Sequence, residues 1–465
     1  MTEDISAPRI SRRSLLRTGA VAAAVAAGLP SCSSTAGRPR RTGGANASSS
    51  QNASSSQNAS SSQNVRVSHD HYGVHVEPSV AVNPRDPRQL LAACQVSPTA
   101  NPEFIAAYLS FDAGASWRSG AVPQLPAGQT TTGDDVTVAF DDHGRGYVCA
   151  TSNSGSRHGY VWRTGDGGRS FSAPVALQGQ YFDHPWIAAG TGQTLSERNV
   201  YVAWAGGSHG NACSFTRSTD GGQSFEAPRT IIPVDDIGMM TVAGELAGGA
   251  HGLVCAVADR HALPDASGNV HAQVVAVCST DGGKSFAAPV ALGTDSPFFN
   301  LPGGAKPNSG PTVAAAPHGD ALYAAFTSHH PGAIHSDIMV TASHNGGRTW
   351  SKAAAATPRD SVTYFQPNLA VDAAGRVAIS AFALANGRMD QVLLVSRPRE
   401  LRFHPPLTVT AAPFDPHTAT ASGQKHGAWW IGDYQGIAAG ADGFHLVWND
   451  ARTGTLELFA ATVRP

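Results

Sequence analysis

The side chains best suited to chemistry in this chain are acidic and amide residues that stand just before apolar segments. Asp433 and Tyr434, for example, precede the apolar segment 435–439. A carboxylate with a raised pKa beside an ionised one can serve as the acid and the base that cleave a glycosidic bond. The equivalent position before five other apolar segments holds Glu77, Asp134 and Asp135, Asp183 and His184, Asn308, and Gln366. We predict the acidic catalytic candidates to be Asp433, Glu77, Asp135 and Asp183.

Clustered carboxylates repel each other, so a set of them at one place requires a functional or structural explanation. Catalysis is one reason, and a bound cation with oxygen ligands, calcium above all, is another. The third interpretation is structural, with side chains that cap loops and contact water. The sequence has no HExxH or CxxC spacing, so we assign no metal ligand and no cofactor, and a structural calcium ion stays an open alternative. Six histidines could also meet here, although we expect them to be satisfied within loops: His69, His71, His75, His184, His251 and His426.

Aromatic residues near the same segments suit a sugar ligand. Trp186, Trp429 and Trp430 are candidates for stacking on sugar rings, and burial in the core is the alternative for each. We predict the substrate-binding candidates to be His184, Trp186, Gln366 and Trp430.

A repeated element must position these residues, and five segments share one pattern. The pattern is Ser or Thr, any residue, Asp, any residue, Gly, any residue, Ser or Thr, and an aromatic residue. Its glycine can take the positive φ of a tight hairpin, its Asp can accept bonds from backbone amides, and its aromatic residue packs inward. We interpret these box hairpins as structural turns and place no catalysis on them. They are Ser110–Trp117, Thr164–Phe171, Ser218–Phe225, Ser279–Phe286 and Ser343–Trp350, where Asn345 replaces the Asp; a sixth, Ser396–Phe403, keeps only the first and last residues.

A second repeat precedes the boxes and consists of an apolar strand, a turn and another apolar strand. Pro78–Val82, for example, leads to Leu90–Ala93, and a weaker copy lies near Val242–Ala258. Four antiparallel strands per unit, repeated in series, are the signature of propeller blades. The last unit stops after its third strand, so Val65–Ser68 would supply the outer strand and close the ring. We predict an all-β propeller with seven blades, or six if the weak copy is an elaboration.

The box hairpins resemble the Asp-box, or BNR, repeats of the sialidase (neuraminidase) superfamily. The ending Trp430–Gly436 and Val447–Asp450 is similar to that of secreted bacterial proteins described as exo-alpha-sialidase-like. The resemblance covers about residues 65–465. It implies a β-propeller fold and a glycoside hydrolase whose nucleophile is a Tyr, for which Tyr434 is the best candidate, with an Asp as acid and base.

Sialidases grip the substrate carboxylate with three arginines, one of which lies in a Tyr/Phe-Arg-Ile-Pro motif. The comparable stretch here is His75-Val76-Glu77-Pro78, in which Val76 takes the place of the arginine. The other two arginines have no evident counterpart at strand starts. Without that cluster the chain lacks the bidentate clamp for a sialic acid carboxylate, so the resemblance supports the fold more firmly than the activity.

The N-terminal segment predicts export. Paired arginines in Ser11–Arg17 precede the apolar run Ala20–Leu29, which is too short to span a bilayer, and this is the pattern of a twin-arginine signal peptide over residues 1–32. Leu29–Cys32 resembles a lipoprotein cleavage site, so we expect lipidation of Cys32, with ordinary cleavage and release as the alternative. Residues 33–64 contain three copies of Ala-Ser-Ser-Ser-Gln-Asn and predict a flexible tether; residues 65–465 form the propeller.

Composition narrows the function classes. A formal net charge of -2 leaves no basic field for nucleic acid or an anionic membrane, so we expect membrane attachment only through Cys32, and a monomer. The remaining five cysteines cannot all pair, and each lies in an apolar run. We predict buried free thiols at Cys94, Cys149, Cys213, Cys255 and Cys278, with a Cys255–Cys278 bridge as the less favoured alternative.

Two functions stay open. The first is an extracytoplasmic glycoside hydrolase that acts on a glycan at the mouth of the central channel. The second is a non-catalytic, surface-tethered propeller that binds a glycan, a peptide or a partner protein.

Overall fold

The computed structural model describes residues 60–61, 63–97, 104–127, 132–152, 157–191, 197–206, 212–233, 240–241, 246–261, 272–295, 310–329, 335–419, 424–425 and 428–465. All of them belong to one compact unit, Ala59–Pro465. The predicted signal peptide, Cys32 and nearly all of the predicted tether lie outside these residues. Within them, no helix has the length and apolar character needed to cross a bilayer.

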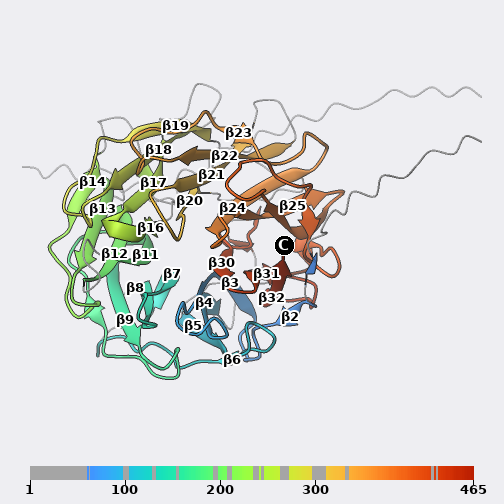
Figure 1. Ribbon diagram of the computed structural model, residues 1–465. Coiled ribbons are helices and arrows are strands. Elements are labelled where there is room, and N and C mark those ends of the chain that lie inside the picture. Colours follow the sequence, from blue (N-terminus) through green and yellow to red (C-terminus); the bar gives the residue numbers. More distant parts are fainter. Residues whose placement is uncertain are drawn as a thin grey trace, which may run out of the picture. The chain divides into compact units, whose positions relative to one another are not determined.

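Antiparallel sheets form a closed ring, as Figure 1 shows. Seven sheets of four or more strands follow one another along the described chain, so the prediction of seven blades is confirmed. Blade 1 contains β3 (Val74–Val82), β4 (Leu90–Ser97), β5 (Phe104–Ser110) and β6 (Arg118–Ser119). Blade 2 contains β7 (Thr132–Phe140), β8 (Gly146–Ser152), β9 (His158–Thr164) and β10 (Val175–Ala176). Blade 3 contains β11 (Asp183–Thr191), β12 (Arg198–Gly206), β13 (Ala212–Ser218) and β14 (Arg229–Ile232).

The weak fourth repeat is a true blade, and two short strands are described at its inner edge. Short strands β15 (Met240–Thr241) and β16 (Leu246–Gly248) both pair with β17 (Val254–His261). Blade 4 is completed by β18 (Ala272–Ser279) and β19 (Val290–Asp295). Blade 5 contains β20 (Thr312–Ala315), β21 (Leu322–His329), β22 (Ser336–Ser343) and β23 (Ala354–Ala355). Blade 6 contains β24 (Thr363–Val371), β25 (Val377–Ala385), β26 (Arg388–Val395) and β27 (Leu407–Thr408).

The N-terminal segment closes the ring, as predicted. Blade 7 consists of β30 (Gly436–Gly440), β31 (Gly443–Asp450) and β32 (Glu457–Arg464), and its outer edge pairs with β2 (Val65–Arg66). The pairing begins earlier than expected, because β1 (Ser60–Ser61) from the predicted tether also pairs with β32. The Glu457 carboxylate accepts hydrogen bonds from Ser68 at 2.5 Å and Arg66 at 2.6 Å, which bonds the two ends of the chain together. Short connections carry the remaining elements: β28 (Gln424–Lys425), β29 (Ala428–Trp429), η1 (Ala250–Gly252) and η2 (Pro416–Ala419).

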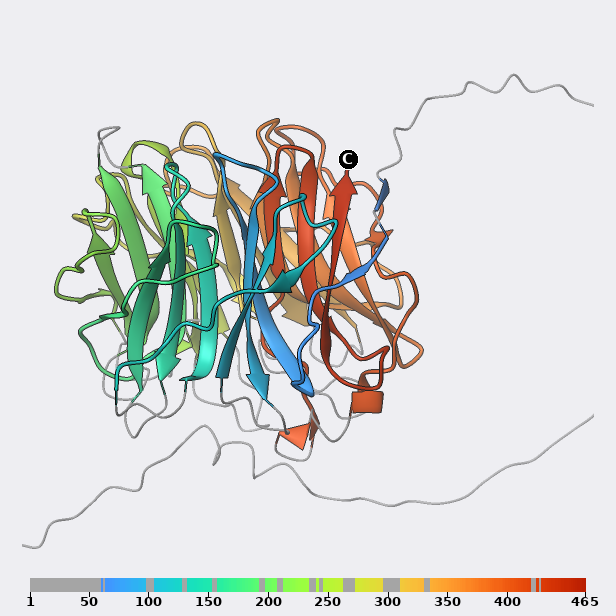
Figure 2. The same cartoon turned by 90° about the horizontal axis from the view of Figure 1, so that it is seen from below.

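The strand directions place the chain's entry point opposite the candidate mouth. Asp433 and Tyr434 precede β30, so they lie at the end of the ring where the innermost strands begin and where β32 also begins. Ser60 pairs with Arg464 at the other end of β32. Figure 2 shows the C-terminus and β1 at one face and β28 and β29 at the opposite one.

The box hairpins join the third and fourth strands of successive blades and have the predicted internal geometry. In the second hairpin, the Asp166 carboxylate accepts bonds from the Ser170 amide at 2.9 Å and the Ser170 hydroxyl at 2.6 Å. The Thr164 hydroxyl accepts a bond from the amide of Gly168, whose φ of 93° is one that L side chains rarely adopt. The other hairpins repeat these contacts, and their closing aromatic residues pack against the hydrophobic clusters between blades.

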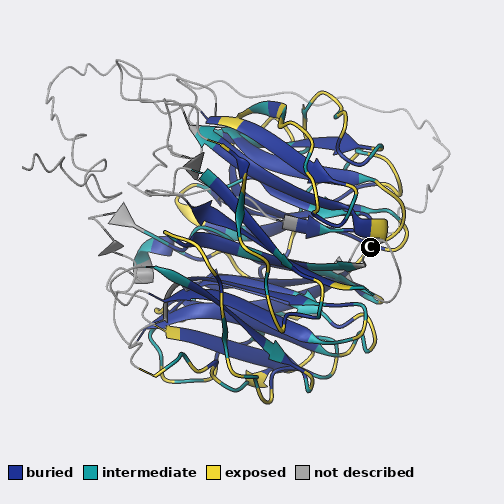
Figure 3. Ribbon diagram, turned by 90° about the vertical axis from the view of Figure 1, so that its left-hand side faces the viewer, coloured by how far each residue is buried: buried dark blue, intermediate teal, exposed yellow. Residues whose placement is uncertain are grey.

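The hydrophobic core lies between neighbouring blades, where both faces of each middle strand are buried (Figure 3). Its largest fully buried side chains include Trp162, Trp204 and Trp448. Near-continuous apolar strands suit this arrangement, because a sheet between two others has no solvent face.

The cysteines follow the prediction at three positions and depart from it at two. Cys94, Cys149 and Cys213 are buried free thiols. The expectation of free thiols at Cys255 and Cys278 is wrong, because a disulfide joins them. The two residues lie directly opposite each other on β17 and β18, with Cα atoms 4.1 Å apart. Cross-strand register brought them together, and register could not be derived from the faint fourth repeat.

Candidate active site at the mouth of the ring

Four of the innermost strands have a bulge at a candidate residue. The strand register slips at Glu77, Asp135, His184 and Gln366, and these residues have positive φ values of 58°, 54°, 47° and 50°. This conformation is strained for residues other than glycine and tends to occur at functional sites. Three of the four precede a proline, which has no N–H to contribute to the broken ladder.

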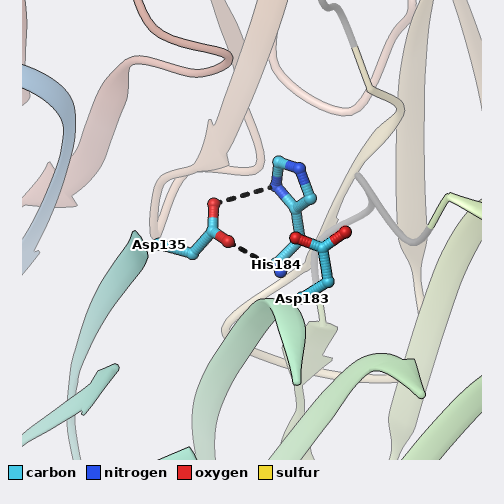
Figure 4. Close-up of side chains that lie close together, drawn as sticks. All are labelled: Asp135, Asp183 and His184. Atoms are coloured by element: carbon cyan, nitrogen blue, oxygen red, sulfur yellow. Dashed lines mark hydrogen bonds and ion pairs between the residues drawn. The ribbon is translucent and has the colours of Figure 1, made fainter. Parts of the chain in front are cut away.

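His184 lies between two carboxylates. Its backbone N–H donates to Asp135 at 2.9 Å, and its ring Nδ1 lies 3.2 Å from the other oxygen of the same carboxylate (Figure 4). The opposite ring nitrogen, Nε2, lies 3.7 Å from Asp433. Asp135 and His184 are almost fully buried, at 3% and 5% exposure. The arrangement links inner strands of blades 2 and 3 to the loop before blade 7.

Asp433 is held from two further directions. Its backbone N–H donates to Glu77 at 3.1 Å, and one carboxylate oxygen accepts a bond from the indole of Trp430 at 2.8 Å. The Glu77 carboxylate also accepts a bond from the side-chain amide of Gln95. Glu77 therefore positions the backbone of Asp433, and Trp430 positions its carboxylate.

Tyr434 spans the ring from blade 7 to blade 2. Its hydroxyl accepts a bond from the Val136 amide at 3.1 Å and donates one to the Val136 carbonyl at 3.2 Å. Its ring meets Trp186 edge to face, with centroids 5.4 Å apart. Burial, and then the charges of Glu77 and Asp135, raise the pKa of the Tyr434 hydroxyl well above 10, so the phenol is neutral at physiological pH.

Asp183 and Gln366 lie at the flanks of this group. Asp183 forms an ion pair with Arg157, a residue that the sequence analysis did not single out. Arg157 precedes the third strand of blade 2, and no local pattern marks it. Gln366 donates to the Gly432 carbonyl at 2.6 Å and accepts a bond from Gln435 at 3.2 Å, which supports the loop that carries Asp433.

A small pocket opens beside these residues. Asp433, Tyr434, His184 and Trp186 form one part of its wall; the other part comes from Gly310, Pro311, Thr312 and Pro367 of blades 5 and 6. The structure therefore brings Asp433, Tyr434, His184 and Trp186 to one pocket, while Glu77, Asp135, Asp183 and Gln366 stand behind or beside it. Asn308, His426 and the side chains of Asp134 and Trp429 lie outside the described parts of the chain.

Three of these residues could hold a cation together. One ligand atom each from Asp135, Asp183 and His184 lies within 4.8 Å of the others. Two carboxylates and an imidazole suit a transition metal better than calcium, which prefers oxygen ligands alone. Arg157 already neutralises Asp183, so a metal would have to compete with a guanidinium. Of the other histidines, the buried His75 bonds to Asp70 at 2.9 Å, and the exposed His69, His71 and His251 are not among the residues that line the pocket.

No family model matches this chain, and no curated protein is significantly similar to it. Solved structures are similar in fold. A polysaccharide lyase, an ulvan lyase bound to -[GlcA(1-4)Rha3S]-, is 12% identical with a TM-score of 0.51, over 85% of this chain and 97% of its own. An alpha-L-arabinofuranosidase of Fusarium graminearum with arabinobiose is 13% identical (TM-score 0.47; 87% and 98%), and a Hadza microbial sialidase is 16% identical (TM-score 0.43; 67% and 64%). At these identities the likeness establishes the propeller fold alone.

Proposed function

We propose that this protein is an exported, tethered propeller that cleaves glycosidic bonds at the mouth of its ring. The observation that carries the proposal is the pocket in which Asp433 and His184 face an aromatic wall of Trp186 and Tyr434. Convergent polar groups beside aromatic side chains are the usual composition of a small-ligand site, and proton-transfer groups within a few Å of each other can serve glycoside hydrolysis.

The contacts suggest a role for each residue. Asp433 and His184 both line the pocket, so they are the groups that would exchange protons with the substrate. Asp135 orients the His184 ring from behind, and Glu77 orients Asp433. Tyr434 remains a candidate nucleophile, although its hydroxyl would first have to leave Val136.

A kinetic comparison tests the proposal. A panel of chromogenic glycosides that includes sialosides is assayed with the wild type, Asp433→Asn and a matched control, Asp86→Asn. Asp86 lies in the turn after β3, far along the strand from the mouth, and pairs with Arg88. We expect turnover of at least one glycoside, a loss of about 100-fold or more in Asp433→Asn, and no loss in the control. Equal turnover in all three proteins would place the chemistry elsewhere.

The second candidate function is binding without turnover. It is favoured by the engagement of the mouth residues with one another, above all the two bonds of the Tyr434 hydroxyl to the Val136 backbone. No turnover of any glycoside, together with clear binding on a glycan array, would support this function and exclude the first.

The family and the location of the protein belong to the same proposal. We take the box hairpins as Asp-box repeats of the sialidase superfamily, and residues 1–32 as a twin-arginine signal with lipidation at Cys32. Because β1 enters the ring at the end opposite the mouth, a tether at the N-terminus attaches away from the substrate side. Expression in a bacterium with and without the twin-arginine translocase tests export, and a Cys32→Ala variant that stays in the membrane fraction would exclude the lipid anchor.

A further inference from the structure

We infer that a groove on the outer side of the ring binds an acidic sugar through two arginines, Arg118 and Arg169, away from the mouth. Residues in and next to the first box hairpin line the groove together with Arg169 of the second, and the groove has a volume of about 410 Å³. Small-ligand sites usually have volumes of roughly 300–1,000 Å³. The inference goes beyond the proposed function, because this groove would hold a glycan without cleaving it.

The groove lies at the end of the ring opposite the mouth. The first two box hairpins follow β5 and β9, which are third strands and run in the same direction as β32, the third strand of blade 7. That strand begins on the side of the mouth and ends where Ser60 pairs with Arg464. Arg118 begins β6, the outermost strand of blade 1, which Figure 1 shows on the rim of the ring. A ligand in the groove is therefore at the other end of the ring from Asp433, which precedes β30.

Both guanidinium groups lie over one phenylalanine ring. The Cζ atom of Arg118 is 4.7 Å from the centroid of the Phe111 ring, and that of Arg169 is 3.9 Å from it. Both arginines are exposed, and neither forms an ion pair with a carboxylate in the described parts of the chain. Arg169 gives one hydrogen bond, to the Asp166 carbonyl of its own hairpin at 3.1 Å. The ring holds the two cations without neutralising them, so an anion that contacts both would relieve their repulsion.

Asp112, the acidic residue among those that line the groove, is engaged within its own hairpin. One carboxylate oxygen accepts bonds from the Ser116 amide and the Ser110 hydroxyl, both at 2.8 Å. The other accepts a bond from the Ser116 hydroxyl at 2.5 Å. The two arginines therefore leave an excess of positive charge in the groove, and a carboxylate or sulfate group on a ligand would balance it.

The rest of the lining is apolar and aromatic. Leu109 and Trp117, which are 2% and 7% exposed, line the groove together with Phe111. An apolar wall with a few polar groups is the usual composition of a small-ligand site, and a sugar ring can pack against it. Guanidinium groups bind carboxylate and sulfate oxygens in a bidentate manner. The combination fits a uronate or a sulfated sugar, because a neutral sugar would leave the arginines unpaired and a free inorganic anion would leave the apolar wall uncovered.

Binding measurements with a matched control test the inference. Calorimetry at low salt compares an oligogalacturonate and a sulfated galactan oligosaccharide with a neutral maltooligosaccharide of the same length. The proteins are the wild type, an Arg118→Gln, Arg169→Gln double variant and Arg88→Gln, in which the changed arginine lies at the same end of the ring but pairs with Asp86. We expect the wild type to bind an acidic oligosaccharide about tenfold or more tightly than the neutral one, and added salt to narrow the difference. The double variant should lose this preference, and Arg88→Gln should keep it.

The remaining outcomes separate this groove from the mouth and from other ligands. Turnover of any small glycoside that the wild type cleaves should be unchanged in the double variant; a fall would overturn the inference, because the groove would then belong to the active site. A preference for acidic sugars that the double variant loses supports the groove even if no glycoside is cleaved and the proposed hydrolase fails. Equal binding of acidic and neutral sugars, or an unchanged preference in the double variant, overturns the inference. So does tighter binding of inorganic sulfate or of an oligoglutamate peptide, which would assign the groove to a free anion or to a protein partner.

Discussion

The hydroxyl of Tyr434 forms two hydrogen bonds with the backbone of Val136, at 3.1 and 3.2 Å, across the ring from blade 7 to blade 2. Val136 follows the bulge at Asp135, and it is the one residue after the four bulges that is not a proline. Its N–H therefore needs an acceptor that the strand ladder does not supply, and Tyr434 supplies it.

Tyr434→Phe tests whether this tyrosine supports the fold or the chemistry. Removing the hydroxyl leaves the Val136 amide and carbonyl unpaired, so we expect the free energy of unfolding to fall by about 1–2 kcal/mol, measured by urea denaturation. If Tyr434 is only structural, activity on a glycoside substrate should fall less than about tenfold. A complete loss of activity with unchanged stability would instead identify the hydroxyl as the nucleophile.

Asp135→Asn tests the orientation of His184. The amide can still accept the bond from the His184 backbone, but it no longer stabilises an imidazolium or fixes the ring tautomer. We expect kcat to fall about 10- to 100-fold with little change in KM, and the pH–rate profile to change shape. A variant that lowers only the thermal stability, with an unchanged pH profile, would contradict a positioning role.

The box hairpins should make stability depend on pH in the acid range. Burial raises the pKa of Asp166, but bonds from the hydroxyl and amide of Ser170 outweigh it and lower the value to about 2. The same balance lowers the pKa of Asp220 and Asp281 to about 2. Since these pKa values lie below that of the unfolded chain, the stabilisation is complete above about pH 4 and is lost as the pH falls toward 2.

Asp166→Ala checks this mechanism. We expect a loss of about 1 kcal/mol at pH 7, comparable to the loss of a helix cap, and a smaller loss at pH 2, where about half of the wild-type carboxylates are protonated. Urea denaturation at both pH values measures it. The matched control is Asp320→Ala, because Asp320 is an exposed carboxylate in the connection between β20 and β21, outside the box hairpins. An equal loss at both pH values would argue against the charged cap.

Asp259 should make stability depend on pH in the opposite direction from the box hairpins. It is fully buried on β17, and neither carboxylate oxygen has a hydrogen-bond partner. Burial raises its pKa well above 3.8, so the folded protein holds this proton at pH values at which the unfolded chain releases it. The contribution of Asp259 to the free energy of unfolding therefore decreases as the pH rises above about 4.

Asp259→Asn removes that ionisation while keeping the shape. We expect the variant to be at least as stable as the wild type at pH 7, and its advantage to disappear near pH 3, where both side chains are neutral. Thermal unfolding across this pH range provides the measurement. A variant that is less stable than the wild type at pH 7 would mean that the carboxyl has a partner which an amide cannot replace.

The Cys255–Cys278 disulfide should stabilise blade 4. It closes a loop with a sequence separation of 23, which in the chain-entropy picture corresponds to about 3 kcal/mol. We expect a reductant to lower the free energy of unfolding of the wild type by roughly this amount and to have no effect on a Cys255→Ala, Cys278→Ala double variant. As a check, the protein without its signal peptide is unfolded and alkylated with no prior reduction. Alkylation of five thiols would show that the disulfide does not form.

The sequence by itself determined the architecture, because a propeller is built from local repeats. The spacing of Ser110, Asp112, Gly114 and Trp117 defines a hairpin through contacts within eight residues, and copies of that hairpin recur along the chain. The seven blades followed from counting the strand-turn-strand repeat that precedes the boxes, and closure by the N-terminal segment followed from the outer strand that the last unit lacks. The positions before each inner strand could also be predicted to meet, since a closed ring brings equivalent ends of its blades together.

Only the tertiary structure decided which side chains at those positions contact one another. Three contacts join residues of different blades or connections. They are the approach of His184 to Asp433, the hydrogen bond of Tyr434 with Val136, and the ion pair of Arg157 with Asp183. The bulges shift the register of the innermost strands next to these contacts, and the register of β17 and β18 places the two cysteines of the disulfide opposite each other. A slip of one residue reverses the face of a strand, so local patterns cannot specify which side chains meet across a ring.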